Sequence, residues 1–183
     1  MQGTVEPSVR HDRPVWLPRR RRAGDALTHV VVELEPDHEG WPPVGAERVW
    51  AEPVGRHRYR IDNIPFFAMD LATDDVVEAR PVSAGQHPTL VRVVKRSPHA
   101  TLRVVCFRAG PLRGDLVAAA QRLGRPGVAT ELADAWGIVA LCVAPSADVS
   151  GLKEALDAGT DDGSWEYEEG RLSTAWLTAT ATG

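Results

Sequence analysis

The sequence predicts an α+β protein whose β-rich N-terminal half, a bent antiparallel sheet or partial barrel, is joined to a ferredoxin-like C-terminal half. Residues 28–94 hold five short runs of alternating or β-branched residues, with frequent turns and no segment of helical periodicity. Residues 101–168 follow the order strand, helix, strand, strand, helix, strand, which is that of the split βαβ arrangement. The expected organisation is a disordered basic tail over 1–26, a β-rich subdomain over 27–97, a ferredoxin-like subdomain over 98–170 and a C-terminal tail over 171–183.

The strands of the N-terminal half are short and are separated by clear turns. The first is rich in β-branched residues, and the segment 35–45 that follows it contains three prolines, which is typical of a loop. A turn that begins at Pro53 lies between the second and third strands, so these two should pair as a hairpin. Strands of this length pack naturally as a bent sheet or partial barrel. The expected strands are 28–34, 47–52, 58–61, 75–82 and 89–94.

The segment Asp62–Phe67 is the most informative structural pattern in the chain. It begins with an Asp-Asn pair, whose short side chains bond nearby backbone amides and favour a turn. Pro65 then fixes φ and biases the residue before it toward an extended conformation. Two phenylalanines follow at once, and rings of this size belong in a core. The pattern predicts a sharp corner followed by buried phenylalanine side chains.

Two helices are expected in the C-terminal half. Apolar residues recur at helical spacing over 112–123 and over 149–156, and a glycine suited to a C-cap follows each segment, at positions 124 and 159. Ser146 or Asp148 can supply the N-cap of the second helix.

The strands of this half are expected at 101–107, 128–132, 137–143 and 164–168. The third is continuously apolar, as a central strand covered on both faces would be. We expect the first and third strands to pair in parallel at the centre of the sheet. They carry Cys106 and Cys142, for which buried reduced thiols are favoured over a disulfide or a reactive thiol.

Length and composition indicate an ordinary globular protein. The 183 residues are enough for one domain with a well-filled core, or for two small ones that share an interface. Hydrophobic residues make up 43% and charged residues 25%, which is typical of soluble proteins. No apolar run approaches the roughly 20 residues that a membrane span needs. Arginines interrupt the N-terminus where a signal peptide would have its apolar core. We therefore expect a cytoplasmic protein.

Charge is unevenly distributed along the chain. The first 26 residues hold six arginines and three acids, a net of +3, and the whole chain is −4, so the remainder carries −7. The run Pro18–Arg22 could attract phosphates or an acidic partner, and a solvated extension is the alternative. Trp16 is the residue of this segment best suited to pack against the fold. A body this acidic argues against a broad nucleic-acid surface.

Five blocks of the sequence resemble a known bacterial family. They are Glu47-Arg-Val-Trp-Ala-Glu, Tyr59-Arg-Ile-Asp-Asn-Ile-Pro-Phe-Phe, Asp75-Val-Val, Ser97-Pro-His-Ala-Thr-Leu-Arg-Val and Trp165-Glu-Tyr-Glu-Glu-Gly. In this combination the chain resembles the family catalogued as domain of unknown function 4265, over about residues 28–170. The Asp-Asn-Ile-Pro-Phe block is the most specific part. The resemblance implies no activity, so it supports the fold prediction and leaves function open.

The common catalytic and cofactor motifs are missing from the sequence. The six histidines are scattered, and no Cys-x-x-Cys or His-Glu-x-x-His pattern offers a metal site. The glycines around 110–114 and 124–127 do not form a phosphate-binding loop. No Gly-x-Ser-x-Gly elbow is present. We expect no cofactor and no metal.

An open sheet face in the C-terminal half could bind RNA if its central strands offered aromatic residues for base stacking. The strand 137–143 offers none, and the body of the protein is acidic. Nucleic acid is therefore an unlikely partner by this reasoning. Trp165 and Tyr167 share one face of the last strand, where they form either an aromatic wall beside a pocket or part of the core.

Polar residues at two places are the remaining candidates for a site. His99, Thr101 and Arg103 lie close together where the two halves join, and a histidine beside an arginine can handle protons or anchor a carboxylate. The alternative is a turn histidine and an arginine paired with an acid. Glu47 and Asn63 lie in an otherwise apolar region, where they either line a cleft or are buried with their hydrogen bonds satisfied.

Two functions fit these patterns. The leading expectation is a small cytoplasmic bacterial binding protein that recognises a protein or small-molecule partner, with no role for membranes. The alternative is a cofactor-independent enzyme of specialised metabolism, in which a cleft between the halves uses His99 as acid or base and Arg103 as anion anchor. Such an enzyme needs a closed pocket that reaches both residues. Ferredoxin-like sheets often pair, so a homodimer is a further expectation by fold analogy.

Overall fold

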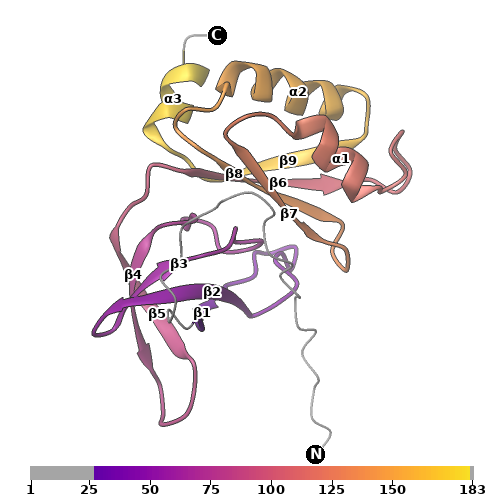
Figure 1. The fold of residues 1–183 in the computed structure, drawn as a ribbon. Coiled ribbons are helices and arrows are strands. Elements are labelled where there is room, and N and C mark those ends of the chain that lie inside the picture. Colours follow the sequence, from indigo (N-terminus) through magenta and orange to yellow (C-terminus); the bar gives the residue numbers. More distant parts are fainter. Residues whose placement is uncertain (1–26, 182–183) are drawn as a thin grey trace, which may run out of the picture.

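The computed structural model describes residues 27–181, and the segment 1–26 discussed above lies outside them. Within the described residues the chain is a mixed α/β protein with a five-stranded and a four-stranded sheet and three helices. Figure 1 shows the first five strands below the second sheet, whose helices lie on the side away from them. The strands are β1 (Thr28–Glu33), β2 (Ala46–Gly55), β3 (Arg58–Ile61), β4 (Val76–Pro81), β5 (Pro88–Lys95), β6 (Ala100–Cys106), β7 (Val128–Ala133), β8 (Ile138–Val143) and β9 (Trp165–Arg171). The helices are α1 (Leu116–Leu123), α2 (Val149–Asp161) and α3 (Thr174–Thr180).

Strands β1–β5 follow one another around a closed barrel. All five strands expected in this half are present, and the barrel is closed rather than partial. Successive strands pair antiparallel, whereas β1 and β5 close the barrel in parallel with Val31 opposite Thr89 as their registered pair. Alternation along each strand points small and branched side chains inward, where they form the barrel core. This core contains Val30, Val32, Val49, Ala51, Ile61, Val77 and Ala79.

The second sheet has the strand order β7-β8-β6-β9, and all its neighbours pair antiparallel. The predicted parallel pairing of the strands that carry Cys106 and Cys142, β6 and β8, was wrong. The crossover through α1 makes β6 and β7 run in the same direction, but β8 lies between them. Because β7 and β8 are joined by a tight hairpin, β8 must run opposite to both.

Helices α1 and α2 are found where their periodicity predicts them. Asp115 caps α1 by accepting from the N–H of Ala118, and Asp148 caps α2 by accepting from the N–H of Gly151. Gly124 is the C-cap of α1 as expected, but the expected end of the second helix at Gly159 was wrong, because α2 continues to Asp161 and has its C-cap at Asp162. Both helices pack on the β6 face that carries Leu102 and Val104, forming the larger core of the protein.

The C-terminal segment was expected to be an irregular tail, and this was wrong for residues 174–180. They form α3, which Ser173 caps by accepting from the N–H of Trp176. Trp176 is buried in the same core as α1 and α2, and its indole donates to Glu169 at 3.0 Å. Burial of this ring therefore organises a segment whose threonines are poor helix formers.

The corner, residues Asp62–Asp75, lies between the barrel and the opposite face of the second sheet. Ile64, Phe66 and Phe67 pack there against small side chains of β7 and β8, forming a third core. The phenylalanines are thus buried as predicted, but against the second sheet rather than inside the barrel. The residues contributed by β7 and β8 are Ala129, Ala133, Ile138, Ala140 and Cys142. The corner is what joins the two halves.

Candidate functional site

Buried side chains bind the backbone of the corner, and Glu47 makes the largest contribution. It lies near the start of β2, points inward and is 2% exposed. Its Oε1 accepts from the N–H of Phe66 at 2.6 Å, and its Oε2 accepts from those of Phe67 at 3.0 Å and Ala68 at 2.8 Å. Because the corner leaves regular strand structure here, the carboxylate supplies acceptors for amides that burial separates from water.

Asn63 and Glu131 hold the beginning of the same corner. The Oδ1 of Asn63 accepts from the N–H of Trp50 at 2.8 Å, and its amide group donates to the carbonyl of Ile64 at 3.1 Å. Glu131, on β7, accepts from the N–H of Ile64 at 3.1 Å. Of the two interpretations for Glu47 and Asn63, the geometry matches that of buried residues whose hydrogen bonds are satisfied within the fold.

Arg103 binds the corner from the side of the second sheet. Its Nη1 donates to the carbonyl of Phe67 at 3.0 Å and lies 3.3 Å from Oε2 of Glu168, and its Nη2 contacts the sulfur of Met69 at 2.8 Å. Burial lowers the pKa of Arg103, and the carboxylates of Glu168 and Glu47 oppose this shift. The two terminal nitrogens of the guanidinium thus contact groups of the protein itself, and its buried Nε has no hydrogen-bond partner among the described residues.

His99, Thr101 and Arg103 alternate along β6 and the residue before it, so they share the face that looks toward the barrel. The structure therefore brings together the residues that the sequence grouped. The Nδ1 of His99 lies 3.9 Å from Oδ2 of Asp74, and Arg171 donates to the carbonyl of His99. These contacts join the end of the corner to β6 and β9.

The junction around these residues is filled with side chains. Arg103 is 1% exposed and Thr101 is fully buried. Neither His99 nor Arg103 lines the pocket at the barrel described below. The enzymatic alternative needs a pocket that reaches both residues, and the pocket at the barrel reaches neither.

Trp165 and Tyr167 lie on the face of β9 that is covered by α2, away from the other candidates. Trp165 is fully buried, and its Nε1 donates to the carbonyl of Leu156 at 3.0 Å. The hydroxyl of Tyr167 donates to Asp157 at 3.0 Å. A Cβ at Gly159 would overlap the Trp165 ring, so this glycine allows α2 to approach the strand closely. Both aromatic side chains belong to the helix-covered core.

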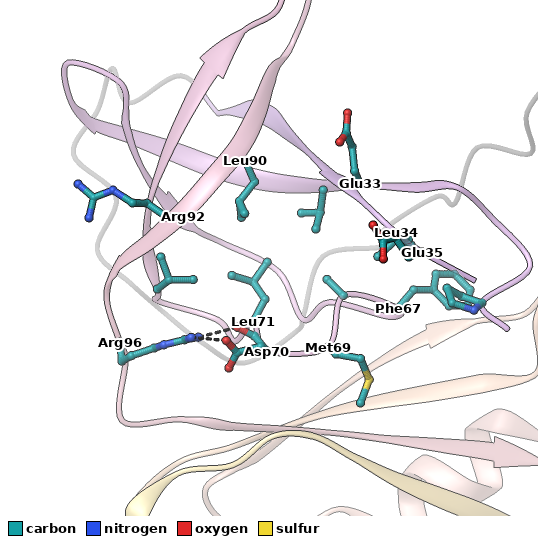
Figure 2. A pocket seen from close by; sticks show the side chains of 14 residues that line it. Glu33, Leu34, Glu35, Phe67, Met69, Asp70, Leu71, Leu90, Arg92 and Arg96 are labelled. Atoms are coloured by element: carbon teal, nitrogen blue, oxygen red, sulfur yellow. Dashed lines mark hydrogen bonds and ion pairs between the residues drawn. The ribbon is translucent and has the colours of Figure 1, made fainter. Parts of the chain in front are cut away.

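A pocket opens in the barrel where β1 and β5 separate, a region we call the seam. Beyond the pair Val31 and Thr89 the two strands diverge, and a cavity of about 450 Å³ lies between them. Ala68 and Leu71 of the corner are buried beside it, and Leu71 and Leu90 point toward each other across it in Figure 2. The lining residues are Val32, Glu33, Leu34, Glu35, Pro42, Phe67, Ala68, Met69, Asp70, Leu71, Leu90, Arg92, Val93 and Arg96. This seam pocket has the volume and largely apolar lining of a small-molecule site.

Charged residues of opposite sign flank the seam pocket on opposite strands. Glu33 and Glu35 lie on the β1 side, whereas Arg92 and Arg96 lie on the β5 side. Arg96 is tied to Asp70, because its Nη1 donates to the Asp70 carbonyl at 2.5 Å and its Nη2 donates to the carboxylate. Arg92 is 60% exposed and remains close to solvent at the rim.

The seam pocket was not anticipated from the sequence. Leu90 was placed correctly on a predicted strand, but nothing in its neighbourhood signals that the strand would separate from β1. Closure of a barrel depends on contacts between residues far apart in the chain, and these leave no local pattern. The candidate residues Glu47, Asn63, Thr101, Trp165 and Tyr167 all lie elsewhere.

The two cysteines lie on opposite faces of the second sheet. Cys106 belongs to the helix-covered core and Cys142 to the core at the corner, and both are free thiols. Burial raises the pKa of Cys106 to about 11 and that of Cys142 to about 12, so both thiols are protonated at neutral pH. Cys142 pairs with Thr101, five positions from Cys106 along β6, so the two thiols are too far apart for a disulfide in this fold.

Residues 27–181 contain neither a cluster of metal-ligating side chains nor a membrane-spanning helix. No group of three or more histidine, cysteine, aspartate or glutamate side chains is close enough there to hold a metal ion. None of the helices in that range combines the length and the apolar character needed to cross a membrane.

Comparison with known proteins gives a family and a fold. The family described as Domain of unknown function (DUF4265) matches residues 47–167. A solved structure described as a hypothetical protein from Neisseria gonorrhoeae is similar, with a TM-score of 0.61 and 20% identity, covering 84% of this chain and 99% of that one. No curated protein matches the chain. The resemblance seen in the sequence is therefore confirmed, and the structural likeness supports the fold.

Proposed function

We propose that this chain, which belongs to the family described as Domain of unknown function (DUF4265), is a small bacterial binding protein whose ligand occupies the seam pocket. A cytoplasmic location and a ligand of small-molecule size are part of the proposal. The observation that carries it is the seam pocket itself, a cavity of about 450 Å³ at the least tightly closed part of the barrel. Pockets of this size hold most of the surface of a small ligand.

The contrast with the junction supports a binding role over a catalytic one. At the junction, Arg103 and Glu47 are hydrogen-bonded to the backbone of the corner. The seam pocket is lined by apolar side chains, including Leu34, Leu90 and Val93, with its charged residues at the rim. Apolar walls bind a ligand by burying its surface.

In this proposal the C-terminal half is a ferredoxin-like scaffold. Its sheet is covered by helices on one face and by the corner on the other, through the contacts of Ile64, Phe66 and Phe67. The scaffold positions the corner, and the corner in turn provides Ala68 and Leu71 to the seam pocket. A homodimer would leave this arrangement unchanged, since the pocket is built from one chain.

The test uses a neutral apolar dye, N-phenylnaphthylamine, whose fluorescence rises on entering an apolar site. We expect saturable binding to the wild-type protein. The substitution Leu90→Glu places a carboxylate in the pocket wall and should abolish the signal. The matched control is Val91→Glu on the same strand, because Val91 is exposed and does not line the pocket.

Both variants must remain folded, as judged by circular dichroism and the midpoint of thermal unfolding. Equal dye binding by the wild-type protein and a folded Leu90→Glu variant would contradict the proposal. Loss of binding in Val91→Glu as well would contradict it too, since the effect would then not depend on the pocket.

A further inference from the structure

Three arginines converge on one carboxylate on the outer face of the barrel, next to the seam pocket. Arg58, Glu78 and Arg92 lie opposite one another on β3, β4 and β5. Arg80 follows two residues later on β4 and reaches back to the same carboxylate. The distances to the Glu78 oxygens are 2.6 Å from Nη2 of Arg80, 3.1 Å from Nη2 of Arg92 and 4.0 Å from Nη2 of Arg58. We call Arg58, Arg80 and Arg92 the arginine cluster.

The cluster carries more positive charge than Glu78 can balance. Three guanidinium groups face one carboxylate, which leaves a local excess of two positive charges in a body that is otherwise acidic. The hydrogen bond from Arg80, and then the charges of all three arginines, lower the pKa of Glu78, so the carboxylate is ionised and aligns the guanidinium groups. Within residues 27–181 the buried Nη1 of Arg58 has no hydrogen-bond partner. Unused donors of this kind favour an added anion.

The cluster is continuous with the seam pocket through Arg92. This residue belongs to both, since its side chain lines the pocket and its guanidinium binds Glu78. Two of the three acids at the pocket, Glu33 and Glu35, lie on the β1 side, so they disfavour an anion at their own side of the opening. The third, Asp70, is paired with Arg96. A ligand with one charged end would therefore be oriented by the charges on the two strands.

We propose that the ligand of the seam pocket is an amphipathic anion, with its apolar part between β1 and β5 and its phosphate or carboxylate group on the arginine cluster. This inference rests on the proposed function and adds the chemical class of the ligand. Arginine is suited to this role because its planar group can bind two oxygens of a phosphate or carboxylate at once. The apolar part supplies affinity, and the cluster supplies charge selection and orientation.

The test compares three probes with the same apolar chain, octyl phosphate, octanol and octylamine, together with inorganic phosphate, by isothermal titration calorimetry at low ionic strength. We expect octyl phosphate to bind at least about ten-fold more tightly than octanol, as a charged hydrogen bond would provide. This advantage should shrink as salt is added. Octylamine and inorganic phosphate should bind more weakly than octyl phosphate.

Arg80→Gln should remove most of the advantage of octyl phosphate over octanol, because octanol carries no charged group for the arginine cluster to bind. Arg80 is 64% exposed and does not line the pocket, so this variant should fold normally. Arg108→Gln is the control, because Arg108 is an exposed arginine in the C-terminal half. Arg80→Lys should restore part of the advantage, since the charge is kept and the second donor is lost.

The outcomes separate the two proposals. Equal binding of octyl phosphate and octanol, or tighter binding of octylamine, would overturn the inference about the anion while the pocket proposal stands. Inorganic phosphate that binds as tightly as octyl phosphate would also overturn it, because the pocket would then add nothing. If neither octanol nor octyl phosphate binds the wild-type protein, the pocket proposal itself fails.

Discussion

The corner and the seam belong to the same barrel, yet they are held together in opposite ways. At the corner, Glu47, Asn63 and Arg103 supply hydrogen bonds to backbone groups that would otherwise be buried without partners. At the seam, two strands meet with Val31 opposite Thr89 and then diverge around a pocket with apolar walls. The corner is held by hydrogen bonds from buried side chains to its backbone, whereas the seam is open because its strands are incompletely paired.

This difference shows why polar residues in an apolar region are ambiguous indicators of function. A carboxylate such as Glu47 can be retained because a turn needs acceptors for its amides, with no ligand involved. A binding pocket, in contrast, can be built from leucines and valines that any barrel core would contain.

Removal of the Glu47 carboxylate should have the largest effect on stability. Glu47→Ala leaves the amides of Phe66, Phe67 and Ala68 buried without their acceptor, so we expect a loss on the order of 4 kcal/mol in the free energy of unfolding. Urea denaturation followed by circular dichroism measures it, with Glu154→Ala on the exposed face of α2 as control. A loss similar to that of the control would show that the corner does not depend on this carboxylate.

Substitution of Arg103 should have the next largest effect. Arg103→Met keeps much of the apolar stem but removes the hydrogen bond to the Phe67 carbonyl. It also removes the positive charge near Glu47 and Glu168. We expect the free energy of unfolding to fall by about 2–3 kcal/mol. Gly170→Ala tests the same contact from the other side, since a Cβ there would overlap Nη2 of Arg103. If Arg103 packs as described, combining the two substitutions should cost less than the sum of their separate effects, because both act on the same side chain.

At the seam, a truncation should affect binding more than stability. Leu90 is only partly buried and borders a cavity that already exists, so Leu90→Ala should lower the free energy of unfolding by about 1 kcal/mol. Binding of N-phenylnaphthylamine should nevertheless weaken measurably, because a wall of its site is removed. A large loss of stability with unchanged dye affinity would mean that Leu90 is an ordinary core residue.

The smallest expected effect concerns pH and the arginine cluster. The pKa of Glu78 is lowered from its ordinary value of 4.5, first by the hydrogen bond from Arg80. A carboxyl group with a lowered folded pKa stabilises the protein above its unfolded pKa, and this stabilisation is lost as the pH falls through the folded pKa. Between about pH 6 and pH 3 the wild-type protein should therefore lose slightly more stability than Glu78→Gln. Parallel acid unfolding curves would contradict this.

The fold was predictable from the sequence where the signals are local. The five strands of the barrel, the cap Asp148 and the buried phenylalanines of the corner each follow from side chains within a few positions. The direction of β8 could not be read in this way, because it follows from the order of strands across the sheet. Helix α3 was missed because its threonines have low helix propensity, whereas a tertiary contact of Trp176 stabilises it.

The candidate site could be predicted from the sequence even less well than the fold. His99, Thr101 and Arg103 were grouped because they lie close together in the sequence where the two halves join, but sequence could not show that Arg103 donates to the corner. The pairing of Arg58, Glu78 and Arg92 joins three strands, so it emerges only once the barrel register is known. Sites built across a barrel depend on register, and register is a property of the whole sheet.

Native mass spectrometry of the gently purified protein, run beside its Leu90→Glu variant, tests most directly whether the seam pocket is a ligand site. We predict that the wild-type protein retains a small molecule, and that the variant prepared in the same way lacks it. The mass of that molecule, measured after release, should correspond to an amphipathic anion. A small molecule retained equally by both proteins would contradict the account, because its site would then lie outside the seam.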